Sequence, residues 1–169
     1  LVHPDYNPDA FGVNDLTLLR LAVPSAVPPM EWLPSSMASL ELIGTPVIFA
    51  GYGSTEFGTI GTKLWVDGSI SAVTPTGLEN QQDDATGTCG GDSGGPLIYD
   101  FGGTWYVGGT TSWGDSACTD YGWSMRVSAF DSWVADFAGG GTSGCVTDAE
   151  CNDGNVCTDD ICSIVDGGC

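Results

Sequence analysis

The chain has 169 residues and a net charge of −19, with 22 acidic side chains against three basic ones. Such an acidic surface disfavours nucleic acid and anionic membranes as partners, and no apolar run is long enough to cross a membrane. The 26 glycines, nine prolines and low charged fraction predict short strands joined by turns, and therefore an all-β protein. Seven cysteines predict disulfides and an extracellular, secreted location.

The first half of the chain alternates loop and strand signals. Residues 1–14 are rich in Pro, Asn and Asp and are expected to form a loop, after which Asp15 precedes an apolar, strand-like segment at 16–21. Residues 24–40 form a Pro- and Ser-rich connector. An apolar strand is predicted from residue 46 to a glycine turn that ends by residue 55, and a pair of strands is predicted within 64–73.

A glycine-rich loop at residues 86–97, with the sequence TGTCGGDSGGPL, carries the clearest chemical signal. Glycines let the main chain approach a ligand and adopt positive φ, and Pro96 ends the turn by fixing its own φ. This geometry suits Ser93 as a nucleophile. A serine attacks a carbonyl only when a base takes its proton and donors stabilise the oxyanion, and the backbone N–H groups of Gly91 and Ser93 are the candidate donors.

The remaining elements follow the loop in order. Residues 96–99 and 104–110 flank a turn at 100–103 and predict a hairpin. Ser128 and Asp131 form a plausible capping box for a C-terminal helix with an apolar stripe at Phe130, Trp133, Val134 and Phe137. We therefore expect one domain over residues 1–138, a Gly-rich linker at 139–144 and a Cys-rich module at 145–169.

The C-terminal module contains five cysteines at close intervals among Asp, Asn and Gly: Cys145, Cys151, Cys157, Cys162 and Cys169. Disulfides fit this pattern better than zinc because the module has no histidine. A calcium loop fits poorly because Asp153 stands where the sharp-turn glycine should be. The run resembles the short Cys-rich repeat of some extracellular microbial and slime-mould proteins, and its odd cysteine count indicates an incomplete module.

The loop at 86–97 resembles the nucleophile motif of the chymotrypsin-like serine proteases, the trypsin superfamily. The resemblance implies a double β-barrel, of which this chain holds a complete second barrel and little of the first, followed by a C-terminal helix and a small disulfide-rich tail. It also implies a secreted, monomeric serine endopeptidase that cleaves polypeptide substrates through an acyl-enzyme on Ser93, with no metal or cofactor. Asp15 matches the aspartate that orients the catalytic histidine.

The same resemblance implies the substrate-binding residues. A strand at 112–114 would pair with an extended peptide, through Ser112, Trp113 and Gly114. Gly87 would form the base of the primary specificity pocket, with Gly114 and Gly122 as its walls. Without an acid at the base, we expect a large apolar or aromatic side chain to enter, although Asp115 and Asp120 lie nearby and favour cations. The resemblance pairs Cys89 with Cys118 in a disulfide that braces the pocket.

The chain has one histidine, His3, which lies 12 positions before Asp15. The family places its catalytic histidine roughly 45 residues before the aspartate, and a His-Pro-x-Tyr run in a surface loop where His3 lies. We therefore expect the catalytic histidine upstream of this fragment. The resemblance also implies a freed N-terminal amine upstream, which pairs in this family with the aspartate before the nucleophile, here Asp92. Residues 1–169 alone are then expected to be inactive, with a poorly ordered oxyanion loop. The alternative is a non-catalytic protease homologue that serves as a secreted binding or adhesion module.

Overall fold

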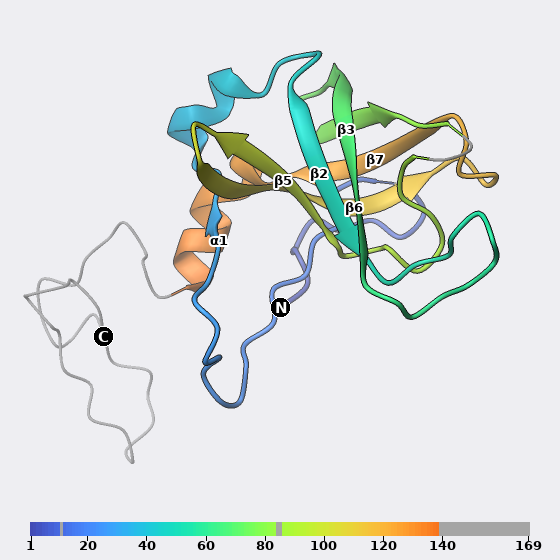
Figure 1. The fold of residues 1–169 in the computed structure, drawn as a ribbon. Helices are drawn as coiled ribbons and strands as arrows, with labels where there is room; N and C mark the ends of the chain where they lie inside the picture. Colours follow the sequence, from blue (N-terminus) through green and yellow to red (C-terminus); the bar gives the residue numbers. More distant parts are fainter. Residues whose placement is uncertain (11, 84–85, 139–169) are drawn as a thin grey trace, which may run out of the picture. The chain divides into compact units, whose positions relative to one another are not determined.

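The computed structural model describes residues 1–10, 12–83 and 86–138 (Figure 1). The chain divides into two compact units, Leu1–Phe130 and Asp131–Cys169. The predicted linker at 139–144 and the Cys-rich module at 145–169 lie outside the described residues. No helix in the described ranges has the length and apolar character needed to cross a membrane.

Six antiparallel strands of the first unit close into a barrel (Figure 1). The strands are β2 (Pro46–Gly51), β3 (Leu64–Val73), β4 (Gly77–Gln81), β5 (Pro96–Phe101), β6 (Thr104–Gly114) and β7 (Tyr121–Arg126). They neighbour one another in the order β6-β5-β2-β3-β4-β7, and pairing between β6 and β7 closes the ring. A two-residue strand, β1 (Glu31–Trp32), adds to β6 in parallel. The predicted all-β class and the complete second barrel are confirmed.

Local turn chemistry explains the hairpin between β5 and β6. Gly102 and Gly103 form its two-residue loop with φ of 69° and 90°, which matches the twist of the flanking strands. The predicted pair of strands within 64–73 is instead the single strand β3. Gly68, in the middle of this strand, lies over the Phe49 ring, where a Cβ would come to 3.0 Å from Phe49 Cε2. The glycine therefore makes room for a core ring and does not reverse the chain.

The first 30 residues contain little regular structure. The strand expected after Asp15 does not form, and the segment makes only the isolated bridge between Val2 and Thr17 within the described residues. Its apolar side chains are largely solvent-exposed, with Leu19 at 79 % and Leu21 at 66 %. A strand needs a neighbouring strand for its N–H and C=O groups, and this segment has none within residues 1–10, 12–83 and 86–138.

The barrel core is formed by side chains that alternate along the strands. In β2, Val47 and Phe49 are buried while their neighbours are more exposed, as the two-residue period of a strand requires. The buried cluster consists of Leu33, Val47, Phe49, Ile70, Leu78, Leu97 and Tyr99. Burial raises the pKa of Tyr99, and the nearby Glu41 charge raises it further.

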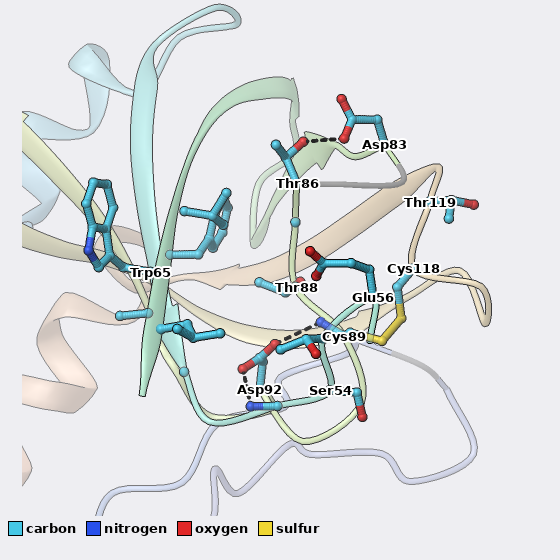
Figure 2. Close-up of a pocket in the computed structure, with 18 of the residues that line it drawn as sticks. Ser54, Glu56, Trp65, Asp83, Thr86, Thr88, Cys89, Asp92, Cys118 and Thr119 are labelled. Atoms are coloured by element: carbon cyan, nitrogen blue, oxygen red, sulfur yellow. Dashed lines mark hydrogen bonds between the residues drawn. A yellow bond between two sulfur atoms is a disulfide. The ribbon is translucent and has the colours of Figure 1, made fainter. Parts of the chain in front are cut away.

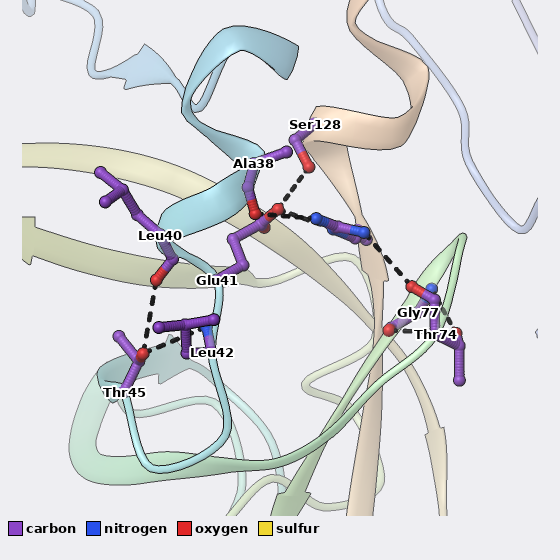
Figure 3. Close-up of polar contacts among 9 residues, drawn as sticks. Ala38, Leu40, Glu41, Leu42, Thr45, Thr74, Gly77 and Ser128 are labelled. Carbon is purple, nitrogen blue, oxygen red and sulfur yellow. Dashed lines mark hydrogen bonds and ion pairs between the residues drawn. The ribbon is translucent and has the colours of Figure 1, made fainter.

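A buried ion pair ties the segment before β2 to the end of β7. Glu41 is 2 % exposed, and its Oε2 lies 2.6 Å from Nε of Arg126. Arg126 also donates from Nη2 to the carbonyl of Ala38 at 3.0 Å and from Nη1 to that of Thr74 at 3.4 Å. Figure 3 shows Glu41 between Ala38 and Ser128, whose hydroxyl donates to the same Oε2. The Arg126 guanidinium therefore links its own strand β7 to residues 38–41 and to Thr74.

The predicted C-terminal helix forms as α1 (Asp131–Phe137). Ser128, the expected start of its capping box, lies in the preceding 3-10 turn η2 (Val127–Phe130), and its hydroxyl donates to Glu41. A second 3-10 turn, η1 (Ser35–Leu40), occupies the end of the connector at 24–40.

Candidate active site

Ser93 lies in the loop between β4 and β5, and the backbone of β6 fixes the residues that follow it. Gly94 N–H donates to the carbonyl of Thr111 at 2.8 Å, and Thr111 N–H donates to the carbonyl of Gly95 at 2.9 Å. Ser93 itself is exposed. The serine is therefore presented to solvent on a loop that is anchored on its C-terminal side.

The backbone around Ser93 leaves two N–H groups available. Gly91 has φ of +99°, and a Cβ at this position would lie 3.1 Å from the Cα of Gly53, so only glycine fits without strain. Asp92 N–H donates to the carbonyl of Cys89 at 3.0 Å. The N–H groups of Gly91 and Ser93 donate to no acceptor among the described residues, as an oxyanion-binding pair requires.

The Asp92 carboxylate accepts two backbone hydrogen bonds (Figure 2). Oδ1 accepts from Gly53 N–H at 2.8 Å, and Oδ2 accepts from Cys89 N–H at 2.9 Å. The sequence had suggested a carboxylate that lacks its partner when the N-terminal amine is missing. In the structure the chain's own amides hold this carboxylate, and they tie the nucleophile loop to the turn after β2.

Asp15 is paired with Ser112 across 97 positions of sequence. Ser112 Oγ donates to Asp15 Oδ2 at 2.6 Å. Asn14, with φ of +51°, forms the turn that presents Asp15, and its side chain donates to the carbonyl of Asp5 at 3.0 Å. Because Thr111 holds the loop of Ser93, the neighbouring Ser112 brings Asp15 to the same end of the barrel. No sequence signal indicated this hydrogen bond, although both residues were predicted site residues.

His3 occupies the surface turn in which the resemblance placed it. Its Nδ1 accepts a hydrogen bond from Asp5 N–H at 3.2 Å, and its ring packs edge-on against Phe130 with centroids 5.2 Å apart. Its backbone N–H donates to the carbonyl of Leu16 at 3.0 Å. These contacts assign His3 a role in holding the N-terminal turn against the barrel.

Two of the predicted pocket glycines pack against one buried side chain. Gly87 and Gly122 both lie against the side chain of Gln82, which is 5 % exposed. A Cβ at Gly87 would lie 2.4 Å from Gln82 Cδ, and one at Gly122 would lie 2.4 Å from Gln82 Oε1. The third predicted residue, Gly114, lies close to Gly122 and to the carbonyl of Tyr121. Gln82 thus occupies the space beside Gly87 and Gly122, and the entry of a large apolar side chain between these glycines stays a prediction.

The loop beside the pocket is braced by a disulfide and by Asp115. Cys89 and Cys118 are joined, as the resemblance implied. The Asp115 carboxylate accepts hydrogen bonds from backbone N–H groups of its own loop, those of Ala117, Thr119, Asp120 and Tyr121. These bonds, that of Asp120 first, lower the pKa of Asp115. Its oxygens thus organise the loop.

Trp113, predicted to align the substrate, belongs to an aromatic cluster on β6 and β7. Its ring stacks on Trp123 with centroids 5.7 Å apart and an interplanar angle of 7°. Tyr121 meets the Trp113 ring edge-on at 5.7 Å. Trp123 and Tyr121 therefore both support the Trp113 ring.

A cavity of about 400 Å³ opens beside Asp92 (Figure 2). Its lining includes Gly53, Trp65 and Thr88 together with Asp92, whereas Ser93 does not line it. Among residues 1–10, 12–83 and 86–138 no group of three or more His, Cys, Asp or Glu side chains is arranged to hold a metal ion. The lining also includes Gly87, Cys89 and Cys118 but neither Gly114 nor Gly122.

The chain is similar in sequence to proteins of a known family. The family described as Trypsin matches residues 1–134. Vitamin K-dependent protein C of Oryctolagus cuniculus is 29 % identical over 162 residues, which cover 79 % of this chain and 35 % of that protein. Kallikrein 1-related peptidase b5 and Kallikrein-1, both of Mus musculus, are 31 % and 32 % identical over 166 residues, which cover 79 % of this chain and 60 % of each relative.

The chain thus spans between about one third and three fifths of the length of these relatives. The family match covers most of the chain and includes the barrel, Asp15 and the loop of Ser93. The protein therefore belongs to the trypsin family of chymotrypsin-like serine proteases.

Proposed function

We propose that this chain carries the nucleophile-bearing part of a secreted, monomeric serine endopeptidase, which cleaves peptide bonds through an acyl-enzyme on Ser93. The observation that carries the proposal is the pair of unengaged N–H groups of Gly91 and Ser93, next to an exposed serine hydroxyl. Two neighbouring donors without an acceptor fit an enzyme that stabilises an oxyanion better than they fit a binding protein. The Cys89–Cys118 disulfide agrees with secretion.

In the proposed reaction Ser93 Oγ attacks the scissile carbonyl carbon while a histidine from outside residues 1–169 takes the hydroxyl proton. The carbonyl oxygen becomes an oxyanion that accepts from Gly91 and Ser93 N–H. The histidine then gives its proton to the leaving amine, and water releases the acyl group by the same steps in reverse. Loss of one oxyanion donor typically lowers kcat by about 10²–10³.

Asp15 orients that histidine in the proposed mechanism. Ser112 occupies Oδ2 of the carboxylate at 2.6 Å, so Oδ1 is the acceptor for an imidazole N–H. A fixed carboxylate selects one tautomer of the base and stabilises the imidazolium that forms when the proton moves. Ser112 therefore acts as a positioning residue for Asp15.

The end of β6 offers an edge for the substrate backbone. β5 pairs with β6 only as far as Thr110, whereas β7 pairs with Trp113 and Gly114 from the other side. An extended peptide can add to β6 beyond Thr110, along the side where its pairing with β5 has ended, and form main-chain hydrogen bonds there. This supports a polypeptide as the substrate.

The isolated chain is expected to be inactive because its single histidine belongs to the N-terminal turn. The cavity beside Asp92 supports the entry of an upstream segment whose ammonium group would join Gly53 and Cys89 as a partner of the carboxylate. Such a partner would stabilise the loop of Ser93 through charge pairing in a partly buried site.

Hydrolysis of a mixed peptide library tests the proposal, using the protein expressed with the sequence encoded upstream of residue 1. Ser93→Ala should lower kcat by about 10⁶, whereas Ser36→Ala, an exposed serine in η1, should leave it unchanged. An upstream barrel that is complete but has no histidine beside Asp15, with no hydrolysis above background, would support the non-catalytic binding module instead.

A further inference from the structure

We propose that Gln82 forms the floor of the primary specificity pocket and restricts it to small, uncharged side chains of the residue on the acyl side of the scissile bond. The inference rests on the proposed protease function and names the substrate class of that same site. Gln82 was not among the predicted site residues. It follows directly on β4, with its N–H donating to the carbonyl of Asp120 at 2.8 Å.

The side chain of Gln82 fills the space between two pocket glycines that are far apart in sequence. Gly87 lies against its Cδ, and Gly122 lies against its Oε1, each with room for hydrogen but not for a Cβ. In the family arrangement these two glycines mark the base and one wall of the pocket. The carboxamide therefore stands where the tip of a long substrate side chain would otherwise reach.

Four hydrogen bonds hold the carboxamide in this place. Oε1 accepts from Thr88 N–H at 2.9 Å, from the Thr88 hydroxyl at 3.1 Å and from Asn80 Nδ2 at 3.2 Å. Nε2 donates to the Thr88 carbonyl at 3.1 Å. Asn80 is 2 % exposed and lies opposite Gly122 in the pairing of β4 with β7. A substrate cannot push Gln82 aside without leaving several buried polar groups unpaired.

The chemistry of the floor sets the selectivity. Three donors saturate the carbonyl oxygen of Gln82, and one of the two N–H bonds of Nε2 remains for a substrate acceptor. The floor carries no charge, and the oxygens of the nearby Asp115 serve its own loop, so lysine and arginine gain no ion pair. A large aromatic ring would remove water from the polar Gln82 carboxamide without offering it a hydrogen-bond acceptor. The short side chain of alanine ends before the carboxamide, and serine and asparagine carry an oxygen that can accept from it.

The test uses the protein with its upstream sequence and peptide substrates that differ only in the acyl-side residue: alanine, asparagine, phenylalanine or lysine. The concentration of active enzyme is measured by titration with a fluorophosphonate probe. We expect wild-type kcat/KM for alanine and asparagine to exceed that for phenylalanine and lysine by about tenfold or more. Gln82→Ala should raise the phenylalanine-to-alanine ratio by about tenfold or more because it deepens the pocket.

Gln82→Glu is the second variant and keeps the side-chain size, so the test stands even if Gln82→Ala does not fold. It places a carboxylate at the floor and should raise the lysine-to-alanine ratio by about tenfold or more. Gln81→Ala is the matched control: Gln81 is the last residue of β4, and its exposed side chain donates to the carbonyl of Asp120 at 3.2 Å. Its ratios should equal those of the wild type.

Two results would overturn the inference in distinguishable ways. Unchanged ratios in both Gln82 variants, with probe reaction at the wild-type level, would remove Gln82 from the pocket and leave the proposed function intact. Absence of probe reaction in the folded wild-type protein would reject the proposed function and the inference with it.

Discussion

Replacement of Arg126 by methionine is the most informative test of what holds the barrel together. Methionine keeps the packing of the long side chain but leaves Glu41, which is 2 % exposed, without its cation at 2.6 Å. The carbonyls of Ala38 and Thr74 lose a donor as well. Breaking a buried ion pair from one side costs about 3–5 kcal/mol, a large part of the 5–15 kcal/mol that stabilises a typical domain.

Urea unfolding followed by tryptophan fluorescence measures this loss at pH 7. The double variant Glu41→Leu, Arg126→Met serves as the control because it removes both charges together, and an apolar pair of similar volume is often nearly neutral. We expect the double variant to recover most of the stability lost in Arg126→Met. A loss below about 1 kcal/mol in the single variant, or an equal loss in both, would refute the role of the pair.

Three further outcomes follow from single contacts. The Tyr99 hydroxyl is buried without a hydrogen-bond partner among the described residues, so Tyr99→Phe should change the free energy of unfolding by less than about 1 kcal/mol; a loss of about 2 kcal/mol or more in urea unfolding would reveal a partner. The lowered pKa of Asp115 means that its stabilisation is complete above its ordinary value of 3.8 and is lost as the pH falls through the lower folded-state value. The stability difference between wild type and Asp115→Asn should therefore shrink in acid, and a difference that stays constant with pH would contradict this. Replacing both Cys89 and Cys118 by serine removes a disulfide that spans 29 positions and should lower the free energy of unfolding by about 2–4 kcal/mol. An unchanged midpoint in urea unfolding would show that the disulfide does not stabilise the fold.

Short-range patterns predicted much of the fold. The β5–β6 hairpin follows from the paired glycines at its turn, because two residues with positive φ match the twist of the flanking strands. The strand β2 follows from an apolar run that ends in glycine. The Cys89–Cys118 disulfide came from family resemblance and not from spacing, since spacing alone leaves the pairing of seven cysteines open.

Contacts between distant residues were beyond prediction from the sequence. Ser112 and Asp15 are 97 positions apart, and only the closure of the barrel brings them together. Gln82 looked like an ordinary polar residue at the end of a strand. Its position matters because Gly87 and Gly122 have no side chains and leave room for it. The register between β4 and β7, which brings Gly122 opposite Asn80, could not be inferred from the sequence.

One long-range contact could not be inferred from a local signal. Ser128 suggested a helix cap, but nothing in the sequence indicated that its hydroxyl donates to Glu41, a buried carboxylate 87 positions away.

The most direct measurement of the central claim is the site of fluorophosphonate attachment. The protein with its upstream sequence is treated with the probe, digested, and analysed by mass spectrometry, with Ser93→Ala as the control. An activated nucleophile predicts one adduct on the peptide that contains Ser93 and none in the variant. A folded protein that forms no adduct, or one that forms it on another serine, would contradict the assignment of Ser93.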